Sequence, residues 1–367
     1  MEFVLSELCD QVMTARAGHK PLIIAGGGSK RFYGNPRHAA PGHYVLDMTA
    51  YRGIVNYQPS ELVVTVRAGT PLAELEAALA EERQMLAFEP PHFEAGATVG
   101  GCVAAGLAGP RRQACGGVRD YVLGTRLLDS QGRVLSFGGE VMKNVAGYDV
   151  SRLLSGSLGI FGAILEVSLK VVPLPAEEVT LVGHGTQAEA LQRFAQWRGQ
   201  PLPVSATAWV PDGDGGEGGR WMARLSGTAP ALRAARQRVG GTELDPAVAR
   251  SAWQALREQT HAFFQGGVPL WRLAVAPTAP PLALGPMLVE WGGGQRWLSA
   301  RADARAVREA AQAAGGHATL FRAQGGAVPD DGVFHPLSPG VAQITRRLKQ
   351  ELDPAGLFNP GRMVLDL

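Results

Sequence analysis

The chain has 367 residues, of which 46% are hydrophobic and 19% are charged, so it is no disordered protein and can fold into two or three domains. A formal net charge of +2 is too small for a dedicated nucleic-acid-binding protein. The three cysteines, Cys9, Cys102 and Cys115, lack CxxC spacing, which argues against a disulfide framework or zinc site and favours a reducing compartment. Because no secretory signal or transmembrane segment is found, we expect a cytoplasmic protein, one that can still bind the inner membrane through partners.

The first part of the chain predicts a helix over residues 1–18, followed by short strands rich in apolar and β-branched residues at 22–25, 44–48, 53–57 and 62–69. Thr70 and Pro71 are typical of a helix N-terminus, with Thr70 as N-cap of a helix through residue 82. Further strands are expected within 121–130, 133–139 and 162–175, with a short helix before the last of them. Prolines at 173 and 175 then mark a boundary.

From 176 to about 325 the pattern alternates between strands and amphipathic helices, which favours an α+β layer with a mostly antiparallel sheet. Strands are expected at 178–184, 205–211, 220–227, 270–277, 287–291, 296–300 and 318–323. Helices are expected at 187–197, 231–239, 247–264 and 302–314, and a last helix at 340–352 leads to the sequence DPAGLFNPGRM.

Three glycine-rich stretches, 26–28, 96–117 and 156–162, all lie in the first half of the chain. Gly-rich turns expose backbone N–H groups to anions, so phosphate binding is the first hypothesis for these stretches. AGGGSKRF does not fit GxxxxGK[ST], and it has Arg31 where GxGxxG needs its third glycine. Two interpretations remain, a cofactor that carries a pyrophosphate and lies across several turns, or tight turns that pack strands closely against helices.

The order of several motifs decides between these interpretations. PLIIAGGGSK, LVVTVRAGTPLAELEAAL, PPHFEAGATVGGCVAAGLAG, KNVAGYDVSRLLSGSLGIFGAILEVSLKV and LDPAGLFNPGRM together resemble the vanillyl-alcohol-oxidase-type, or PCMH-type, FAD-binding family. Within that family the chain is most similar to the FAD-binding subunits of glycolate oxidase. The likeness covers residues 20–175 and 341–364 well, and residues between them mainly by position.

The resemblance implies an α+β protein with a two-lobed PCMH-type FAD-binding domain and an α+β cap domain that has a mostly antiparallel sheet. Residues 1–175 would form the FAD-binding domain, with its lobes split near 58. Residues 176–340 would form the cap, and residues 341–367 would return to the FAD-binding domain.

The resemblance also implies a set of cofactor-binding residues. In chain order they are Gly26, Gly27, Gly28, Ser29, Lys30, Pro90, Pro91, Thr98, Val99, Gly100, Gly101, Ala104, Gly109, Gly116, Gly117, Gly156, Ser157, Gly159, Gly162, Ile164 and Asn359. Relatives with covalent flavin carry a His in the first loop, and since GGGSK has none, we expect non-covalent FAD. Arg111 and Arg112 would either add charge beside the cofactor or belong to a solvated loop.

The resemblance implies an enzyme, a flavoprotein oxidoreductase that converts glycolate, a small 2-hydroxy acid, to glyoxylate. Its partners would be a sister flavin subunit and an iron–sulfur subunit. The His-rich motif of catalytic relatives is missing, so no catalytic residue is assigned; His317 and His335 are candidate bases, and Arg322 and Lys143 candidate carboxylate partners. Two alternatives stay open, a self-sufficient 2-hydroxy-acid or alcohol dehydrogenase and a non-catalytic FAD-binding subunit.

Overall fold

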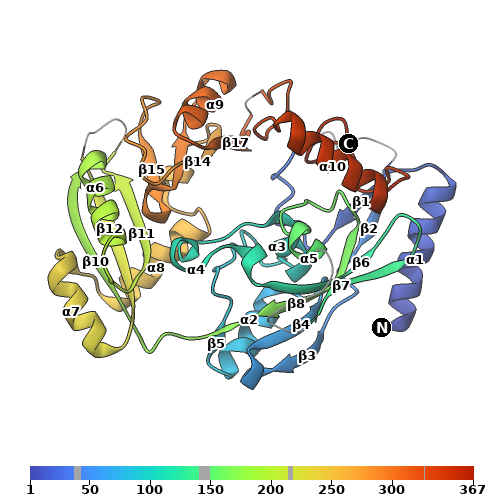
Figure 1. Cartoon of the computed structure of the whole chain (residues 1–367), viewed down its shortest axis with the longest axis horizontal. Helices are drawn as coiled ribbons and strands as arrows, with labels where there is room; N and C mark the ends of the chain where they lie inside the picture. Colours follow the sequence, from blue (N-terminus) through green and yellow to red (C-terminus); the bar gives the residue numbers. More distant parts are fainter. Residues whose placement is uncertain (37–42, 140–148, 214–217, 326) are drawn as a thin grey trace.

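The computed structural model describes residues 1–36, 43–139, 149–213, 218–325 and 327–367. Two large antiparallel sheets lie side by side, one built from the N-terminal part of the chain and one from residues 177–322 (Figure 1). We call the layer around the second sheet the cap. The predicted α+β class with mostly antiparallel sheets is confirmed.

A small parallel sheet opens the chain. Helix α1 (Glu2–Ala17) buries Leu8 and Val12, and it is followed by strand β1 (Leu22–Ala25), which pairs in parallel with β2 (Tyr44–Asp47). On its other side β1 is bridged by Phe358 from the C-terminus, through the pair Leu22–Phe358. The end of the chain therefore completes the first lobe, as Figure 1 shows beside α10 (Pro339–Leu352).

The second lobe is a five-stranded sheet in the order β3-β4-β8-β6-β7. Its strands are β3 (Ile54–Gln58), β4 (Val63–Arg67), β6 (Val122–Leu128), β7 (Val134–Gly138) and β8 (Ala163–Lys170). A two-stranded pair, β5 (Gln84–Met85) and β9 (Val172–Pro173), lies beside it. Because β3 pairs with β4, the chain passes from the first sheet to the second before Ile54, whereas the sequence placed the split between lobes near 58.

Helices α2 (Leu72–Glu81), α3 (Val99–Ala105) and α5 (Val150–Leu153) accompany this sheet, whereas α4 (Arg112–Cys115) packs against the cap. The expected start of α2 needs a correction. Pro71 is the N-cap residue, and no side chain caps the helix. The Thr70 hydroxyl instead accepts a hydrogen bond from Gly53 N–H at 2.8 Å, so it joins the loop before β3 to the start of α2.

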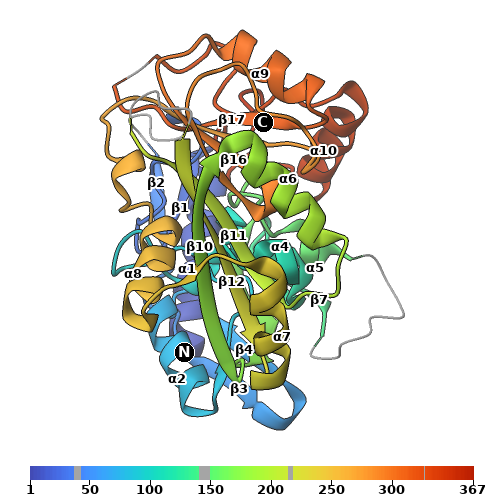
Figure 2. The ribbon, with the colours of Figure 1, turned by 90° about the vertical axis from the view of Figure 1, so that its left-hand side faces the viewer.

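The cap sheet has eight antiparallel strands in the order β13-β10-β12-β11-β15-β16-β14-β17. They are β10 (Glu177–Thr186), β11 (Val204–Pro211), β12 (Gly218–Gly227), β13 (Thr242–Glu243), β14 (Leu270–Ala274), β15 (Met287–Glu290), β16 (Gln295–Ser299) and β17 (His317–Arg322). Helices α6 (Gln187–Arg198), α7 (Ala229–Val239) and α9 (Ala304–Ala313) cover its outer face, and α8 (Pro246–Arg257) packs near β10 (Figure 2).

The inner face of the cap sheet packs on the N-terminal part. Trp297 and Phe321 from the sheet share one buried cluster with Tyr33, Leu107 and Leu158 from the other side. This apolar cluster joins the cap to the N-terminal part, next to the loops formed by the glycine-rich stretches. Within the described ranges, no helix is long and apolar enough to cross a membrane.

Candidate cofactor site

A cavity of about 390 Å³ lies between the two lobes of the N-terminal part. Its walls come from the end of β1 and the loop after it, from β2 and β4, from α3, from the loop before β8, and from the C-terminal segment after α10. Its lining includes apolar side chains, among them Ile24, Met48, Leu158 and Ile164. The site therefore joins segments more than 300 residues apart in the sequence.

The loop at residues 26–30 carries free backbone donors. No described residue accepts a hydrogen bond from any of its five backbone N–H groups; turn bonding resumes at Arg31, whose N–H donates to Gly28 O at 3.0 Å. Ser29 and Lys30 are nevertheless buried. Since buried backbone N–H groups nearly always have an acceptor, this loop is built to receive an anion from outside the chain.

The loop before α3 behaves differently. The Gly100 N–H donates to Ala68 O at 2.8 Å, and the Gly101 N–H donates to the hydroxyl of Thr98, the N-cap of α3, at 3.2 Å. A Cβ on Gly100 would lie 2.5 Å from Ala68 Cβ, and one on Gly27 would lie 1.4 Å from the carbonyl oxygen of Gly96. Glycine is required at Gly27 and Gly100 because backbones and small side chains touch there, so close packing explains these two positions.

The charged side chains in the cavity lining are cationic. Lys30, Arg31 and Arg362 line it, and no aspartate or glutamate of the described ranges does. Lys30 Nζ donates to His92 O at 3.3 Å, and burial lowers the pKa of this amine. Burial also lowers the pKa of Arg362, to about 10, an effect to which the charge of Arg31 adds. A lining with both apolar and cationic side chains suits a ligand that has both a ring system and phosphates.

Most residues expected to bind the cofactor come together at this cavity. Those in its lining are Gly26, Gly27, Gly28, Ser29, Lys30, Thr98, Gly100, Gly101, Ala104, Gly159, Gly162, Ile164 and Asn359. Sequence reasoning missed Arg31, which directly follows the motif PLIIAGGGSK, and Arg362, which lies within the motif LDPAGLFNPGRM. Their signal was a basic residue at the edge of a Gly-rich loop.

The other expected residues do not line this cavity. Pro90 and Val99 are buried in the protein, while Pro91 and Gly109 line a second, much smaller cavity against the cap. Gly116 and Gly117 wrap the Asp120 carboxylate, which accepts from Gly117 N–H at 2.8 Å. Gly156 and Ser157 hold the turn before β8, where Gly156 N–H donates to Val103 O and Ser157 Oγ donates to Leu154 O.

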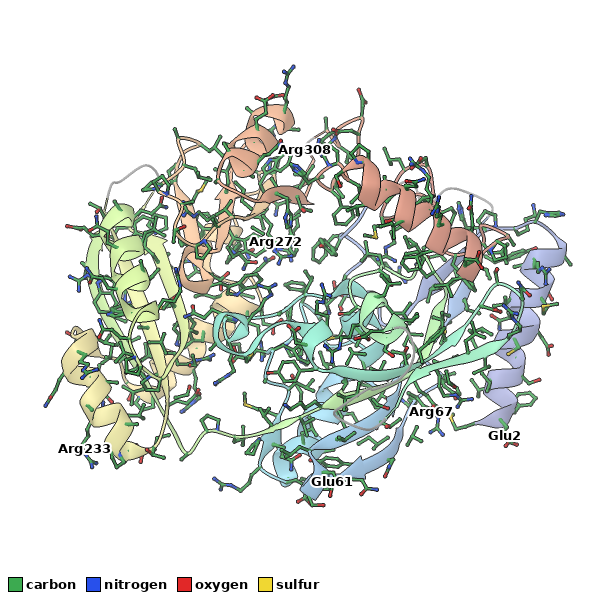
Figure 3. The ribbon with its side chains drawn as sticks, in the orientation of Figure 1. Glu2, Glu61, Arg67, Arg233, Arg272 and Arg308 are labelled. Atoms are coloured by element: carbon green, nitrogen blue, oxygen red, sulfur yellow. The ribbon has the colours of Figure 1, made fainter. Side chains whose placement is uncertain are left out.

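Arg111 and Arg112 match neither interpretation given to them. Arg111 is buried and pairs with Glu89 and with Glu178 of the cap, so it crosses between the two sheets. Arg112 lies over the ring of Trp291, with Arg272 also nearby, at 4.4 and 5.3 Å from the ring centre. Figure 3 shows Arg272 in the middle of the molecule, between the cap strands and the N-terminal part. Arg111 and Arg112 therefore hold the cap against the N-terminal part.

The candidate catalytic residues lie outside the cavity. The rings of His317 and His335 are 6.4 Å apart at the start of β17, and His335 Nδ1 accepts from Ala318 N–H at 3.5 Å. The Arg322 guanidinium lies 4.2 Å from the ring centre of Phe32. Lys143 lies outside the described residues. His92, the other histidine near the loops, pairs with Glu76 at 2.9 Å.

Comparison with known proteins accounts for this cavity. The family model described as an FAD binding domain matches residues 5–138. The glycolate oxidase subunit GlcE of Escherichia coli (strain K12) is 46% identical over 361 residues, which is 98% of this chain and 97% of that protein. The chain belongs to the GlcE family.

Two further comparisons show lower identity. The glycolate oxidase subunit GlcD of Bacillus subtilis (strain 168) is 30% identical over 173 residues, 47% of this chain and 36% of that protein. A solved alkyldihydroxyacetonephosphate synthase superposes with a TM-score of 0.67, covering 98% of this chain and 76% of the other at 16% identity, so it supports the fold.

FAD is the cofactor of this family's domain, and the cavity fits it. The unpaired N–H groups of residues 26–30 and the neighbouring cations match the two phosphates of a dinucleotide, and the apolar lining residues match its rings. Both interpretations of the glycine-rich stretches therefore hold, each for different glycines. Some glycines leave donors and space for the cofactor, and others let two segments of backbone touch.

Proposed function

We propose that this chain is the FAD-binding subunit of a complex that oxidises glycolate, or a closely related 2-hydroxy acid, to the corresponding 2-oxo acid. The observation that carries the proposal is the 46% identity with GlcE over nearly the whole length of both chains, cap included. Substrate choice is made beside a cap in this architecture, so a match restricted to the FAD-binding part would support much less.

The chain's own residues hold and orient the cofactor. The loop at residues 26–30 supplies N–H donors, Ile164 and Leu158 supply apolar contacts, and Asn359 ties the C-terminus to β1. When bound, the flavin ring supplies the acceptor for the hydride that leaves the hydroxyl-bearing carbon. FAD is bound without a covalent link in this proposal, because the 26–30 loop has no His or Cys and His92 is engaged by Glu76.

Partner subunits complete the proposed pathway for electrons. The chain has three cysteines, and no cluster of metal-ligating side chains is found in the portion of it that the structure describes. An iron–sulfur cluster would therefore belong to another subunit, and a second flavin subunit of the GlcD kind would sit beside this one. A place at the inner membrane would then come through those partners.

A second candidate function is oxidation of the substrate on this chain itself, and Arg322 favours it. Its guanidinium stacks on Phe32 and Phe93, at 4.2 and 5.1 Å from the ring centres, where the cap meets the N-terminal part. None of the described carboxylates pairs with it, and burial lowers its pKa to about 10. A cation in that position matches the carboxylate of a 2-hydroxy acid.

The test is the visible absorption spectrum of the purified full chain, before and after anaerobic addition of glycolate. A flavin spectrum that bleaches supports both the cofactor and a working substrate site on this chain, and Arg322→Met should then slow bleaching much more than Arg322→Lys. A flavin spectrum that persists assigns substrate oxidation to the partner. Absence of flavin even after reconstitution with FAD would overturn the proposed function.

A further inference from the structure

The C-terminal segment enters the cavity along a fixed path. Asn359 N–H donates to Leu22 O at 2.9 Å, and Asn359 Oδ1 accepts from Ile24 N–H at 3.0 Å. The same side chain donates through Nδ2 to Leu158 O at 2.7 Å. One asparagine therefore joins the end of the chain both to β1 and to the loop before β8.

Two anchors hold this segment on either side of Asn359. Before it, the buried ammonium of Lys349 donates to Ile160 O at 2.6 Å, Asp353 Oδ2 at 2.7 Å and Phe358 O at 2.9 Å. After it, Asn35 Nδ2 donates to Gly361 O at 3.0 Å, and Asn35 N–H donates to Arg362 O at 2.9 Å. The backbone of Arg362 is thus fixed next to the loop that follows β1.

The Arg362 guanidinium forms no ion pair with a carboxylate in the described parts of the chain. It lines the cavity, and its Nε is buried without an acceptor among the described residues. Arg31 lines the same cavity, with its Nε 3.0 Å from where a Cβ on Gly28 would stand. No ion pair joins either arginine to a described carboxylate. Arg362 is half-buried and Arg31 is exposed, and the like charge of Arg31 makes the charged form of Arg362 still less favourable. An anion bound between or beside the two guanidinium groups would relieve this repulsion.

We propose that Arg31 and Arg362 are paired counter-charges for the pyrophosphate of FAD, so that the C-terminal segment is part of the cofactor site. The inference rests on the proposed function, because it needs FAD as ligand. It goes beyond it by making cofactor retention depend on a residue more than 300 positions after the glycine loop. Arg362 is a binding residue here, while Lys349 and Asn35 are positioning residues.

The test compares two flavins on the deflavinated full chain. Riboflavin keeps the ring system of FAD but has no phosphates. For Arg362→Gln we expect FAD affinity to fall about 10- to 100-fold while riboflavin affinity stays within about twofold of wild type, because only the charged hydrogen bonds are lost. Arg362→Lys should retain most of the FAD affinity. Arg346→Gln, an exposed arginine on α10 that pairs with Asp366, is the matched control.

Each result is read by quenching of flavin fluorescence on titration. Equal FAD affinity for wild type and Arg362→Gln would overturn the inference and leave the proposed function standing. Equal loss of FAD and riboflavin would also overturn it, because Arg362 would then be holding the fold and not the phosphates. If the wild-type chain binds neither flavin, it is the proposed function that fails.

Discussion

Two groups of arginines in this chain have opposite surroundings. At the junction between the cap and the N-terminal part, the buried Arg111 and Arg224 share the carboxylates of Glu89 and Glu178, and we call these four residues the docking group. At the flavin cavity, the exposed Arg31 and the half-buried Arg362 line the same space, and neither pairs with a described carboxylate. The side chains are chemically identical, but their counter-charges differ.

The difference separates docking from ligand binding. A buried cation that a protein carboxylate neutralises fixes how two layers pack, and it needs no anionic ligand. A buried cation without a protein counter-charge costs free energy until a ligand supplies the anion. The two groups should therefore respond in opposite directions when a charge is removed.

The largest effect is expected at the docking group. Glu89 accepts from Arg224 at 2.8 Å and from Arg111 N–H at 2.9 Å, so Glu89→Gln leaves two buried guanidinium groups with only the more exposed Glu178 as counter-charge. We expect a loss of about 3–5 kcal/mol in the free energy of unfolding. Urea unfolding measures it, with the exposed Glu81→Gln as control. A Glu89→Gln protein as stable as the control would contradict the assignment of this network to docking.

The next effect concerns the anchor of the C-terminal segment. Lys349→Met leaves the Asp353 carboxylate and two backbone carbonyls without their donor. We expect a loss of about 3 kcal/mol in stability, since breaking a buried pair exposes the remaining charge to an apolar environment. FAD and riboflavin affinity should both weaken, in contrast to Arg362→Gln. The exposed Arg347→Met on the same helix serves as control, and an unchanged melting temperature would refute the anchor.

The docking group also predicts a pH dependence. Burial alone would raise the pKa of Glu89, but the charges and hydrogen bonds of Arg224 and Arg111 outweigh it, so the pKa is lowered from 4.5. A carboxyl whose folded pKa lies below its unfolded value stabilises the fold above the unfolded pKa, and this part is lost as pH falls through the folded value. Between about pH 5 and pH 3, wild type should lose stability more steeply than Glu89→Gln. If the stability of the two proteins falls equally steeply with pH, the Glu89 carboxyl is not the source of the pH dependence.

The smallest effect on stability is expected at the cavity, where removal of a charge should stabilise the apoprotein. In the apoprotein, Arg362→Gln removes one of two like charges, so its stability should equal or exceed that of wild type by up to about 1 kcal/mol. With saturating FAD the order should reverse. Thermal unfolding with and without FAD measures both. A strongly destabilised apo variant would mean that Arg362 has a protein partner after all.

Sequence reasoning found the parts of the site that are local. GGGSK after a buried strand, and the order of the later motifs, were enough to predict the family, the cofactor and most of the cavity walls. The roles of Arg111 and Arg362 could not be predicted, because each depends on a partner or a neighbour more than 60 residues away. Gly109 and Gly116 were assigned to the cofactor because the sequence alone does not distinguish a glycine needed for close packing from one that makes room for a ligand.

The division into an FAD-binding domain, a cap and a returning segment stays a prediction, with boundaries near 175 and 340. The described contacts agree with a cap that is docked rather than loosely tethered, since Trp291 Nε1 donates to Gly109 O at 3.0 Å and Thr207 Oγ1 donates to Gln113 Oε1 at 2.6 Å. Limited proteolysis followed by mass spectrometry of the fragments would locate the boundaries.

The most direct test of the central claim is a titration of the deflavinated full chain with FAD at increasing salt concentration. The account predicts one FAD per chain, with an affinity that falls as salt is raised, because cations without protein counter-charges attract the phosphates. Absence of binding, or an affinity that does not change with salt, would contradict the assignment of this cavity to the pyrophosphate of FAD.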